Sequence, residues 1–329
     1  MIIRFLAGIA IFLVTASTCL AVDIHRSDVA AFIDSMVSEH DYDRTELERI
    51  LGAAETKQPI LDKIANPAEK TLTWAEYRPI FMTRERVQAG ATFWRENCAM
   101  LDRISAETGV PVEIIVGIIG VETYFGRITG GNRVLDALAT LAFDYPPREE
   151  FFRGELVAFL LLVREEQMQA TDAVGSYAGA MGRPQFMPSS YRAYAVDATG
   201  DGKRDIWNDW ADVAGSIANY FVAHGWSAGK EVTTQATLSS RFKGPVPDNQ
   251  LRADVTVRSL SDAGVVFATG LANDSKGQLL TYAGSDGPEY WVGFHNFFVI
   301  TRYNHSVMYA LAVYQLGQEI AGEIARDDS

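Results

Sequence analysis

A single carboxylate stands at the end of one of the most apolar stretches of the chain. The segment "IIGVETYFG" (118–126) continues an apolar run from Ile114, and Glu122 is the first charged residue after it. We expect a helix that opens at Pro111 to carry Glu122 near its C-terminal end, where the helix dipole is negative. Because the dipole and the flanking apolar groups both disfavour ionisation, the sequence predicts a carboxyl group with a raised pKa.

A carboxylic acid that stays protonated near neutral pH can protonate a glycosidic oxygen, so Glu122 is a candidate general acid. From this helix alone a structural alternative stays open: a helix-end glutamate that is solvated or paired with Arg127.

The sequence lacks the motifs of other common catalytic chemistries. The five histidines have no zinc-binding spacing, and the sequence contains no C-x-x-C pair, no G-x-S-x-G elbow and no phosphate-binding loop.

The elements that must position Glu122 are mostly helical. Apolar residues recur at helical spacing in the following ranges: 24–56, 83–108, the helix from Pro111, 148–168, 212–226 and 305–325. Between 231 and 289, short segments such as "EVTTQATL", "ADVTVRSL", "GVVFAT" and "QLLTYA" read as strands separated by turn residues. The fold class is therefore α+β and predominantly helical, with a helical body over 22–230, a small β-rich insert over 231–289, and a C-terminal strand and helix over 290–329 that return to the core.

The first 21 residues have the pattern of a secretory signal peptide. They carry one positive charge, an apolar stretch of about ten residues and a small-residue end, whereas a membrane span needs about twenty apolar residues. We expect cleavage after Ala21, no transmembrane span in the mature chain, and a soluble periplasmic protein. Cys19 would suit a lipoprotein anchor, but the residues before it fit that signal poorly. The remaining cysteine, Cys98, is expected to be buried and unpaired.

The composition and net charge limit the kinds of partner that the protein can bind. The 329 residues are 48% hydrophobic and 22% charged, as in an ordinary globular protein. The net charge of −13 and the lack of any Lys/Arg run argue against a nucleic-acid partner. No segment indicates a subunit interface, so we expect a monomer.

Several motifs occur in one order along the chain: "GVETYFG" (120–126), "FDYPPREEFF" (143–152), "GSYAGAMGRPQFMPSSY" (175–191), "VDATGDGKRDIW" (196–207) and "NFFVITRYNHSVMYALAVYQLG" (296–317). Together they resemble the lytic murein transglycosylases of the B type, which have a lysozyme-like helical core. The resemblance implies cleavage of the β-1,4 bond between N-acetylmuramic acid and N-acetylglucosamine in peptidoglycan glycan strands. It also implies that the muramyl 6-hydroxyl, rather than water, attacks the anomeric carbon, which leaves a 1,6-anhydro end.

The resemblance assigns roles residue by residue. Glu122 matches the single catalytic acid/base, and no cofactor is needed for catalysis. The other matched positions would bind substrate: Ser176 and Gln185 line the cleft, Tyr77, Tyr303 and Tyr309 lie near the site, and Arg148 suits the peptide stem or lactyl carboxylate. Phe186 would stack on a sugar face. Alternatives remain, because Tyr309 could be a core residue, Ser176 a turn residue and Arg148 a surface residue at a helix start.

The segment "DATGDGKRDIWN" (197–208) resembles an EF-hand loop. Oxygen ligands fall at Asp197, Thr199 and Asp201, and Lys203 would offer its backbone carbonyl. The twelfth position is Asn208 rather than glutamate, and the family resemblance places the bidentate ligand at Asp212 instead. We therefore expect a structural Ca²⁺, with an Asp/Gly-rich surface turn as the alternative reading.

Two rival functions stay open. A hydrolytic muramidase would cut the same bond but needs a second carboxylate to activate water. A catalytically silent peptidoglycan-binding scaffold would need no acid at all, although the presence of Glu122, Ser176 and Gln185 argues against it.

Overall fold

The computed structural model describes residues 20–65, 72–243, 245–246 and 248–327. Most of the expected signal peptide, including Cys19, lies outside these ranges. Its last two residues form the short strand β1 (Leu20–Ala21), which pairs antiparallel with β2 (Glu55–Thr56).

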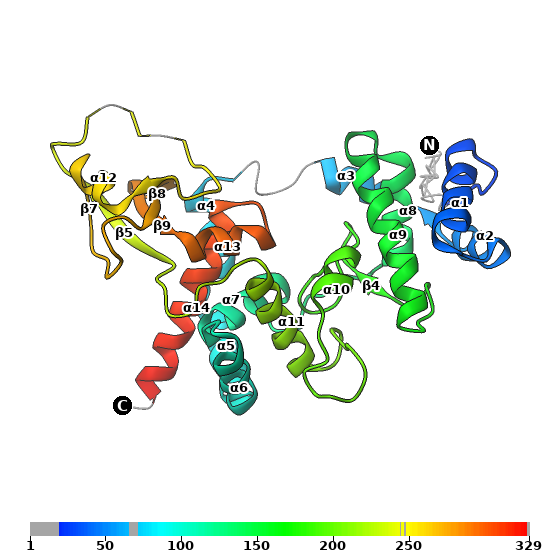
Figure 1. Cartoon of the computed structure of the whole chain (residues 1–329), viewed down its shortest axis with the longest axis horizontal. Coiled ribbons are helices and arrows are strands. Elements are labelled where there is room, and N and C mark those ends of the chain that lie inside the picture. Colours follow the sequence, from blue (N-terminus) through cyan, green and yellow to red (C-terminus); the bar gives the residue numbers. More distant parts are fainter. Residues whose placement is uncertain (1–19, 66–71, 244, 247, 328–329) are drawn as a thin grey trace, which may run out of the picture.

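The helices form two groups, one at the end of the molecule near the N-terminus and one at its centre (Figure 1). The first group comprises α1 (Ser27–His40), α2 (Arg44–Gly52), α3 (Gln58–Ala65), α8 (Val134–Asp144), the short 3₁₀ helix η2 (Pro146–Arg148) and α9 (Glu149–Glu165). The second group comprises α4 (Trp74–Phe81), α5 (Arg84–Glu96), α6 (Cys98–Thr108), α7 (Val112–Thr123), α11 (Trp210–Ala223), α13 (His295–Tyr303) and α14 (Val307–Asp327). Helix α10 (Pro188–Tyr194) packs against both α9 and α11 and so lies between the groups. The strands β3 (Asn132–Arg133) and β4 (Val174–Gly175) pair between them.

Helix α7, which carries Glu122, is buried nearly all round and packs along α14. Two glycines let the backbones touch. A Cβ on Gly117 would lie 2.5 Å from the carbonyl oxygen of Val313, and one on Gly317 would lie 2.1 Å from that of Glu113. The contacts run in opposite chain directions, so the two helices are antiparallel. The C-terminal end of α7 therefore lies beside the first turn of α14.

The β-rich insert is a five-stranded antiparallel sheet of order β6-β8-β9-β5-β7. Its strands are β5 (Thr233–Leu238), β6 (Val255–Thr256), β7 (Val265–Phe267), β8 (Lys276–Gly284) and β9 (Gly287–Phe294). Its strand β9 continues to Phe294, into the segment over 290–329 for which a strand and a helix are expected. The strand expected over "ADVTVRSL" is mostly wrong, because Val257–Asp262 form helix α12, whose start is capped by the Thr256 side chain.

The sheet braces the elements around Glu122. Successive side chains of a strand point to opposite faces. On β8, Leu279 joins the small core of the insert, while Leu280 and Tyr282 join the core of the helical body. The Tyr282 ring lies 5.3 Å from that of Trp74 on α4, and its hydroxyl donates to the Val307 carbonyl at 3.2 Å, where α14 begins. The insert therefore supports both α4 and the first turn of α14.

Two expected long helices are each broken. The 24–56 segment divides at Asp41, which has a φ of 52°, and the 83–108 segment divides at Asn97. Cys98 follows that second break as the first residue of α6 and is exposed, so the expectation that it is buried is wrong.

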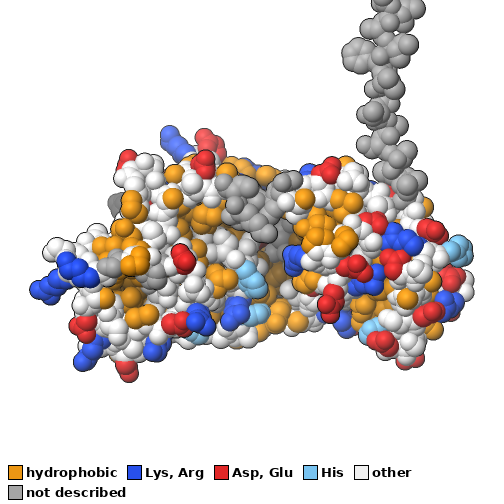
Figure 2. Space-filling view, turned by 90° about the horizontal axis from the view of Figure 1, so that it is seen from above, with side chains coloured by type: hydrophobic (Ala, Val, Ile, Leu, Met, Phe, Trp, Pro, Cys, Tyr) orange, Lys and Arg blue, Asp and Glu red, His pale blue; other side chains and the backbone are white. Residues whose placement is uncertain are grey.

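On the face drawn in Figure 2, acidic and basic side chains are interspersed, with no continuous basic field. Within the described ranges, no single helix has the length and hydropathy of a membrane span.

Candidate active site

Glu122 lies on the last turn of α7 and is half-buried. The hydroxyl of Tyr309, in the first turn of α14, donates a hydrogen bond of 2.5 Å to its Oε1 atom. Burial and the nearby charge of Glu122 raise the pKa of Tyr309 well above its usual value. The phenol therefore stays protonated across the ordinary pH range and acts as a donor that fixes one oxygen of the carboxyl group.

The chain turns sharply immediately after α7. Tyr124, Phe125 and Gly126 all adopt left-handed conformations, with φ of 50°, 57° and 80°. Such conformations cost a non-glycine residue on the order of 1–3 kcal/mol, and they persist where surrounding contacts enforce them. A Cβ at Gly126 would lie 3.1 Å from Trp210, so only glycine fits there without displacing a neighbour.

Thr123 fixes this turn. Its hydroxyl lies 3.3 Å from the carbonyl oxygens of both Ile119 and Arg183, and it accepts the Gly126 N–H at 3.1 Å. Thr123 is fully buried, so these bonds are shielded from water. Sequence reasoning did not select Thr123, although its position directly after Glu122 is a usable signal.

Tyr303, at the end of α13, completes an aromatic pair with Tyr309. Their rings are nearly parallel, 6.5 Å apart at the centroids and tilted by 10°. The Tyr303 hydroxyl donates to the Pro184 carbonyl at 2.6 Å, and burial together with the charge of Glu122 raises its pKa. Tyr303 therefore ties the loop that precedes Gln185 to the wall of the site.

Gln185 lies close to the turn that follows Glu122. It has a φ of 53°, and its side-chain nitrogen donates to the carbonyls of Thr129 and Gly182 at 3.1 and 2.8 Å. The hydrogen bonds that the Ser176 side chain makes are local. Its Oγ accepts the N–H groups of Ala178 and Ala180 at 3.2 and 3.1 Å. The hydroxyl of Ser176 thus closes a turn, which leaves its hydrogen for another acceptor.

The remaining predicted substrate residues differ in position. Tyr77 is 3% exposed and lies near enough to Tyr309 for an electrostatic interaction between the two phenols, so it belongs to the packed surroundings of the site. Arg148 is exposed and stacks on Phe151, with its Cζ atom 4.1 Å from the ring centroid. No contact links Arg148 to the surroundings of Glu122 within the described residues.

Phe186 requires a correction. Its side chain is only 2% exposed, and its ring lies 5.7 Å from those of Tyr220 and Tyr303. The ring is part of the core beneath the site, so it is not open to a sugar face. Adjacent residues of this irregular loop point in different directions, which explains why Gln185 and Phe186 separate.

The EF-hand-like loop leads into α11. Asp197 accepts hydrogen bonds from the N–H groups of Gly200, Asp201 and Gly202 and from the Thr199 hydroxyl, which lower its pKa. Asp212 is fully buried, and burial raises its pKa although it accepts two backbone N–H groups at 2.8 Å.

The residue types in this loop suit a hard cation, because oxygen donors are the ligands that Ca²⁺ prefers. Their carboxylates are turned toward backbone N–H groups, and no cluster of three or more His, Cys, Asp or Glu positioned for a metal occurs in the described ranges.

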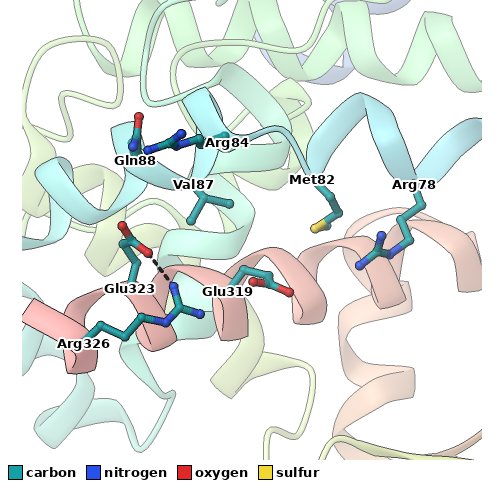
Figure 3. A pocket seen from close by; sticks show the side chains of 8 residues that line it. All are labelled: Arg78, Met82, Arg84, Val87, Gln88, Glu319, Glu323 and Arg326. Atoms are coloured by element: carbon teal, nitrogen blue, oxygen red, sulfur yellow. Dashed lines mark hydrogen bonds and ion pairs between the residues drawn. The ribbon is translucent and has the colours of Figure 1, made fainter.

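A cavity of about 420 Å³ lies away from Glu122, between α5, the end of α4 and the C-terminal half of α14 (Figure 3). It is lined by Arg78, Met82, Arg84, Val87, Gln88, Glu319, Glu323 and Arg326. The Arg326–Glu323 ion pair, at 2.6 Å, bridges one turn of α14. Glu122 and the tyrosines around it do not line this cavity.

A half-buried carboxyl at a helix end, held by a phenol, is suited to the carboxylic acid with which glycan-cleaving enzymes protonate a glycosidic oxygen. The transglycosylase SLT domain family matches residues 25–318. The membrane-bound lytic murein transglycosylase B of Escherichia coli K12 is 46% identical over 299 residues, which cover 88% of this chain and 81% of that protein. The chain belongs to this family and is a peptidoglycan lytic transglycosylase.

Solved structures agree. The soluble lytic transglycosylase SltB1 of Pseudomonas aeruginosa is 48% identical, with a TM-score of 0.85, over 89% of this chain and 98% of that one. The E. coli lytic transglycosylase Slt35 in complex with calcium is 44% identical, with a TM-score of 0.85, over 93% and 97%. SltB3 of P. aeruginosa in complex with NAG-NAM-pentapeptide is 29% identical, with a TM-score of 0.81, over 90% and 80%. The α+β fold class, predominantly helical with a small β insert, is confirmed.

Proposed function

We propose that Glu122 is the single acid/base with which this enzyme cleaves the β-1,4 bond between N-acetylmuramic acid and N-acetylglucosamine. The observation that carries the proposal is the 2.5 Å hydrogen bond from Tyr309 to Glu122 at the end of the buried helix α7. The bond fixes one carboxyl oxygen, and the half-buried setting limits water around the group.

The proposed reaction needs one carboxyl group. Glu122 gives its proton to the glycosidic oxygen as the bond to the anomeric carbon of the muramyl residue breaks, and N-acetylglucosamine leaves with a free hydroxyl. The muramyl 6-oxygen then bonds to the same anomeric carbon, and its proton passes to Glu122. The result is a 1,6-anhydro end with no water consumed and the acid restored for another cycle.

Substrate contacts follow from the neighbours of Glu122. Gln185 and Tyr303 flank the catalytic turn and would position the sugars at the scissile bond, with Ser176 on the same loop. Tyr77 and Tyr309 would act through Glu122 rather than on the sugar. Arg148, exposed at the start of α9, would meet a peptide stem farther along the glycan.

Product masses test the reaction directly. The exported chain and a Glu122→Gln variant are incubated with purified peptidoglycan, and the masses of the soluble products are measured by mass spectrometry. Products lighter by one water than hydrolysis products, together with an inactive variant, support the proposal. Reducing muramyl ends would instead favour the hydrolytic muramidase. Sacculus binding without products would favour the silent scaffold.

We further propose a structural Ca²⁺ held by Asp197, Thr199, Asp201, the Lys203 carbonyl and Asp212. Slt35, which is similar over most of the chain, was solved with calcium, and the loop offers oxygen donors only. Bound calcium would neutralise these clustered carboxylates and stabilise the loop that precedes α11. It would take no part in the chemical step.

The cellular setting is also a proposal. The relatives act on the cell wall, and residues 1–21 have the pattern of a signal peptide, so we infer export to the periplasm as a soluble monomer. Peptidoglycan glycan strands would be the partner, as the NAG-NAM-pentapeptide bound by SltB3 supports. Fractionation of cells that express the tagged chain, with and without the Cys19→Ala substitution, distinguishes a soluble from a lipid-anchored form.

A further inference from the structure

Two guanidinium groups converge on one ring directly after the catalytic helix. The Cζ atoms of Arg86 and Arg127 lie 4.6 and 4.8 Å from the ring centroid of Tyr124, within the range of cation–π contacts. Tyr124 is the second residue after Glu122 and is held in the left-handed turn. The two positive charges therefore lie where the chain leaves the proposed catalytic carboxyl group.

Arg86 is placed in an unusual environment for a cation. It is half-buried, its Nη1 donates to the Gly120 carbonyl at 3.2 Å, and its Nε is buried without an acceptor. Burial lowers its pKa, which reflects the cost of removing the charge from water. No carboxylate pairs with Arg86 within the ranges that the structure describes, and the Gly120 carbonyl and the faces of Phe81 and Tyr124 offset that cost.

Arg127 is exposed, and it too has no ion pair among the described residues. The chain has 42 aspartates and glutamates but only 29 lysines and arginines. A shortage of acidic residues therefore does not explain why an arginine has no ion pair. Arg153 and Arg192, for example, pair with glutamates at 2.6 and 2.7 Å. The positive charge beside Tyr124 is thus not paired with an acid of the described residues, whereas the charges of Arg153 and Arg192 are.

The same wall continues to Glu122. The Phe81 ring lies 5.2 Å from the Arg86 Cζ atom and 5.0 Å from the Tyr77 ring. Tyr77 lies close enough to Tyr309 for the two hydroxyls to influence each other electrostatically, and Tyr309 donates to Glu122. Arg86 is therefore connected through Phe81 to Tyr77, one of the residues expected near the reaction centre.

We propose that Arg86, Tyr124 and Arg127 form a carboxylate-binding site that receives the acidic arm of muramic acid. This inference rests on the proposed function, since the arm belongs to the proposed substrate. Muramic acid carries a lactyl group whose carboxylate is either free or extended by a peptide with carboxylates of its own, whereas N-acetylglucosamine carries none. The planar guanidinium group binds a carboxylate through two parallel hydrogen bonds, which gives orientation as well as attraction. The site distinguishes the two sugars and sets the register of the glycan over Glu122.

Binding tests the site without turnover. The exported chain with Glu122→Gln is titrated calorimetrically with three soluble probes: NAG-NAM-pentapeptide, NAG-NAM with a free lactyl carboxylate, and a tetramer of N-acetylglucosamine. Each titration is repeated with Arg127→Gln, with Arg127→Lys, and with Arg49→Gln, a matched control at an exposed arginine on α2.

We expect Arg127→Gln to lower the affinity for at least one carboxylate-bearing probe by about tenfold relative to the affinity for the tetramer, as the loss of a charged hydrogen bond predicts. Lysine should recover part of the affinity, and Arg49→Gln should change none of the three. Loss for both NAG-NAM probes assigns the lactyl carboxylate, and loss for the pentapeptide alone assigns the peptide. Equal losses for all three probes, or none, would overturn the proposal. These readouts involve no cleavage, so they stand apart from the test of Glu122 as the acid/base.

Discussion

The hydroxyl of Tyr309 lies 2.5 Å from Oε1 of Glu122, although 187 positions separate the two residues in the chain. The contact exists because α7 and α14 run antiparallel with their backbones in contact at Gly117 and Gly317. The end of one helix thereby meets the start of the other. The position of the carboxyl group in the site depends on this helix pair as much as on its own helix.

Removing the donor hydroxyl should slow the reaction without unfolding the protein. We expect Tyr309→Phe to lower kcat about tenfold or more, because it loses a bond that orients the carboxyl group and leaves a buried acceptor with one partner fewer. The ring remains, so the melting temperature should change little. Tyr314→Phe, on the same helix, is the matched control and should keep full activity. An unchanged kcat in Tyr309→Phe would exclude an orienting role for Tyr309.

The contact between the helices predicts a stability effect. Gly117→Ala places a Cβ 2.5 Å from the Val313 carbonyl, so the helices must separate. We expect a loss of roughly 1–3 kcal/mol in the free energy of unfolding, as for other overpacked cores, together with a fall in activity as Tyr309 moves from Glu122. Denaturant unfolding and glycan cleavage measure the two effects.

Gly154→Ala supplies the control for that experiment. Gly154 lies inside α9, and a Cβ there would have no neighbour within 4 Å. Alanine should raise stability by about 0.5–1 kcal/mol, because it removes the entropic cost of a helical glycine. If both substitutions destabilised the protein equally, close helix approach at Gly117 would not be the cause.

The sequence predicts those features of the fold that depend on residues close together in the chain. The apolar run before Glu122 specifies a helix, and the helix expected from residue 83 begins where the Thr83 side chain accepts the Arg86 N–H at 3.2 Å. The strand expected around Val257 failed because Val257 and Leu260 suit either a strand or a helix, and the Thr256 cap decides for the helix. Local pattern cannot resolve such short segments.

In the candidate site too, the sequence indicates features set by neighbouring residues but not those set by contacts between distant segments. Glu122 stands out by its neighbours in sequence, but the approach of Tyr309 and Tyr303 depends on packing between distant segments and was available only through the family resemblance. The burial of Phe186 was missed because periodicity is lost in a loop of positive-φ residues such as Gly182 and Gln185. Arg86 gave no signal, since its role depends on the ring of Tyr124, 38 residues later.

The Arg26–Asp28 pair predicts a pH dependence. Arg26 lies 2.7 Å from Asp28 and holds the pKa of that carboxyl below its ordinary value. A lowered folded-state pKa means that the pair stabilises the protein above the unfolded pKa of about 3.9 and that this contribution is lost as the pH falls through the lower folded value. Asp28→Asn should therefore cost up to about 1 kcal/mol near pH 7, after allowance for solvent screening, and less near pH 3.

Thermal unfolding of the wild type and Asp28→Asn between pH 3 and pH 7 measures that difference. The two melting temperatures should converge toward the acid end. A gap that stayed constant over the whole range would mean that Asp28 contributes through packing or helix capping rather than through its charge.

The proposed calcium loop predicts a stability that depends on the free cation. Asp212 is buried with a raised pKa, and Asp197 and Asp209 add to its negative surroundings, so a bound cation would relieve repulsion in the folded state alone. At a free Ca²⁺ concentration 100 times the Kd, the gain would be about 2.7 kcal/mol, which a melting curve resolves as a rise of a few degrees over a chelated sample. Asp201→Asn should reduce the rise, whereas Asp262→Asn, at an exposed acid of the insert, should not. Because calcium takes no part in the proposed chemistry, residual activity in the chelated sample should follow the folded fraction at each temperature. Identical melting curves with calcium and with chelator would reduce the loop to an Asp/Gly-rich surface turn.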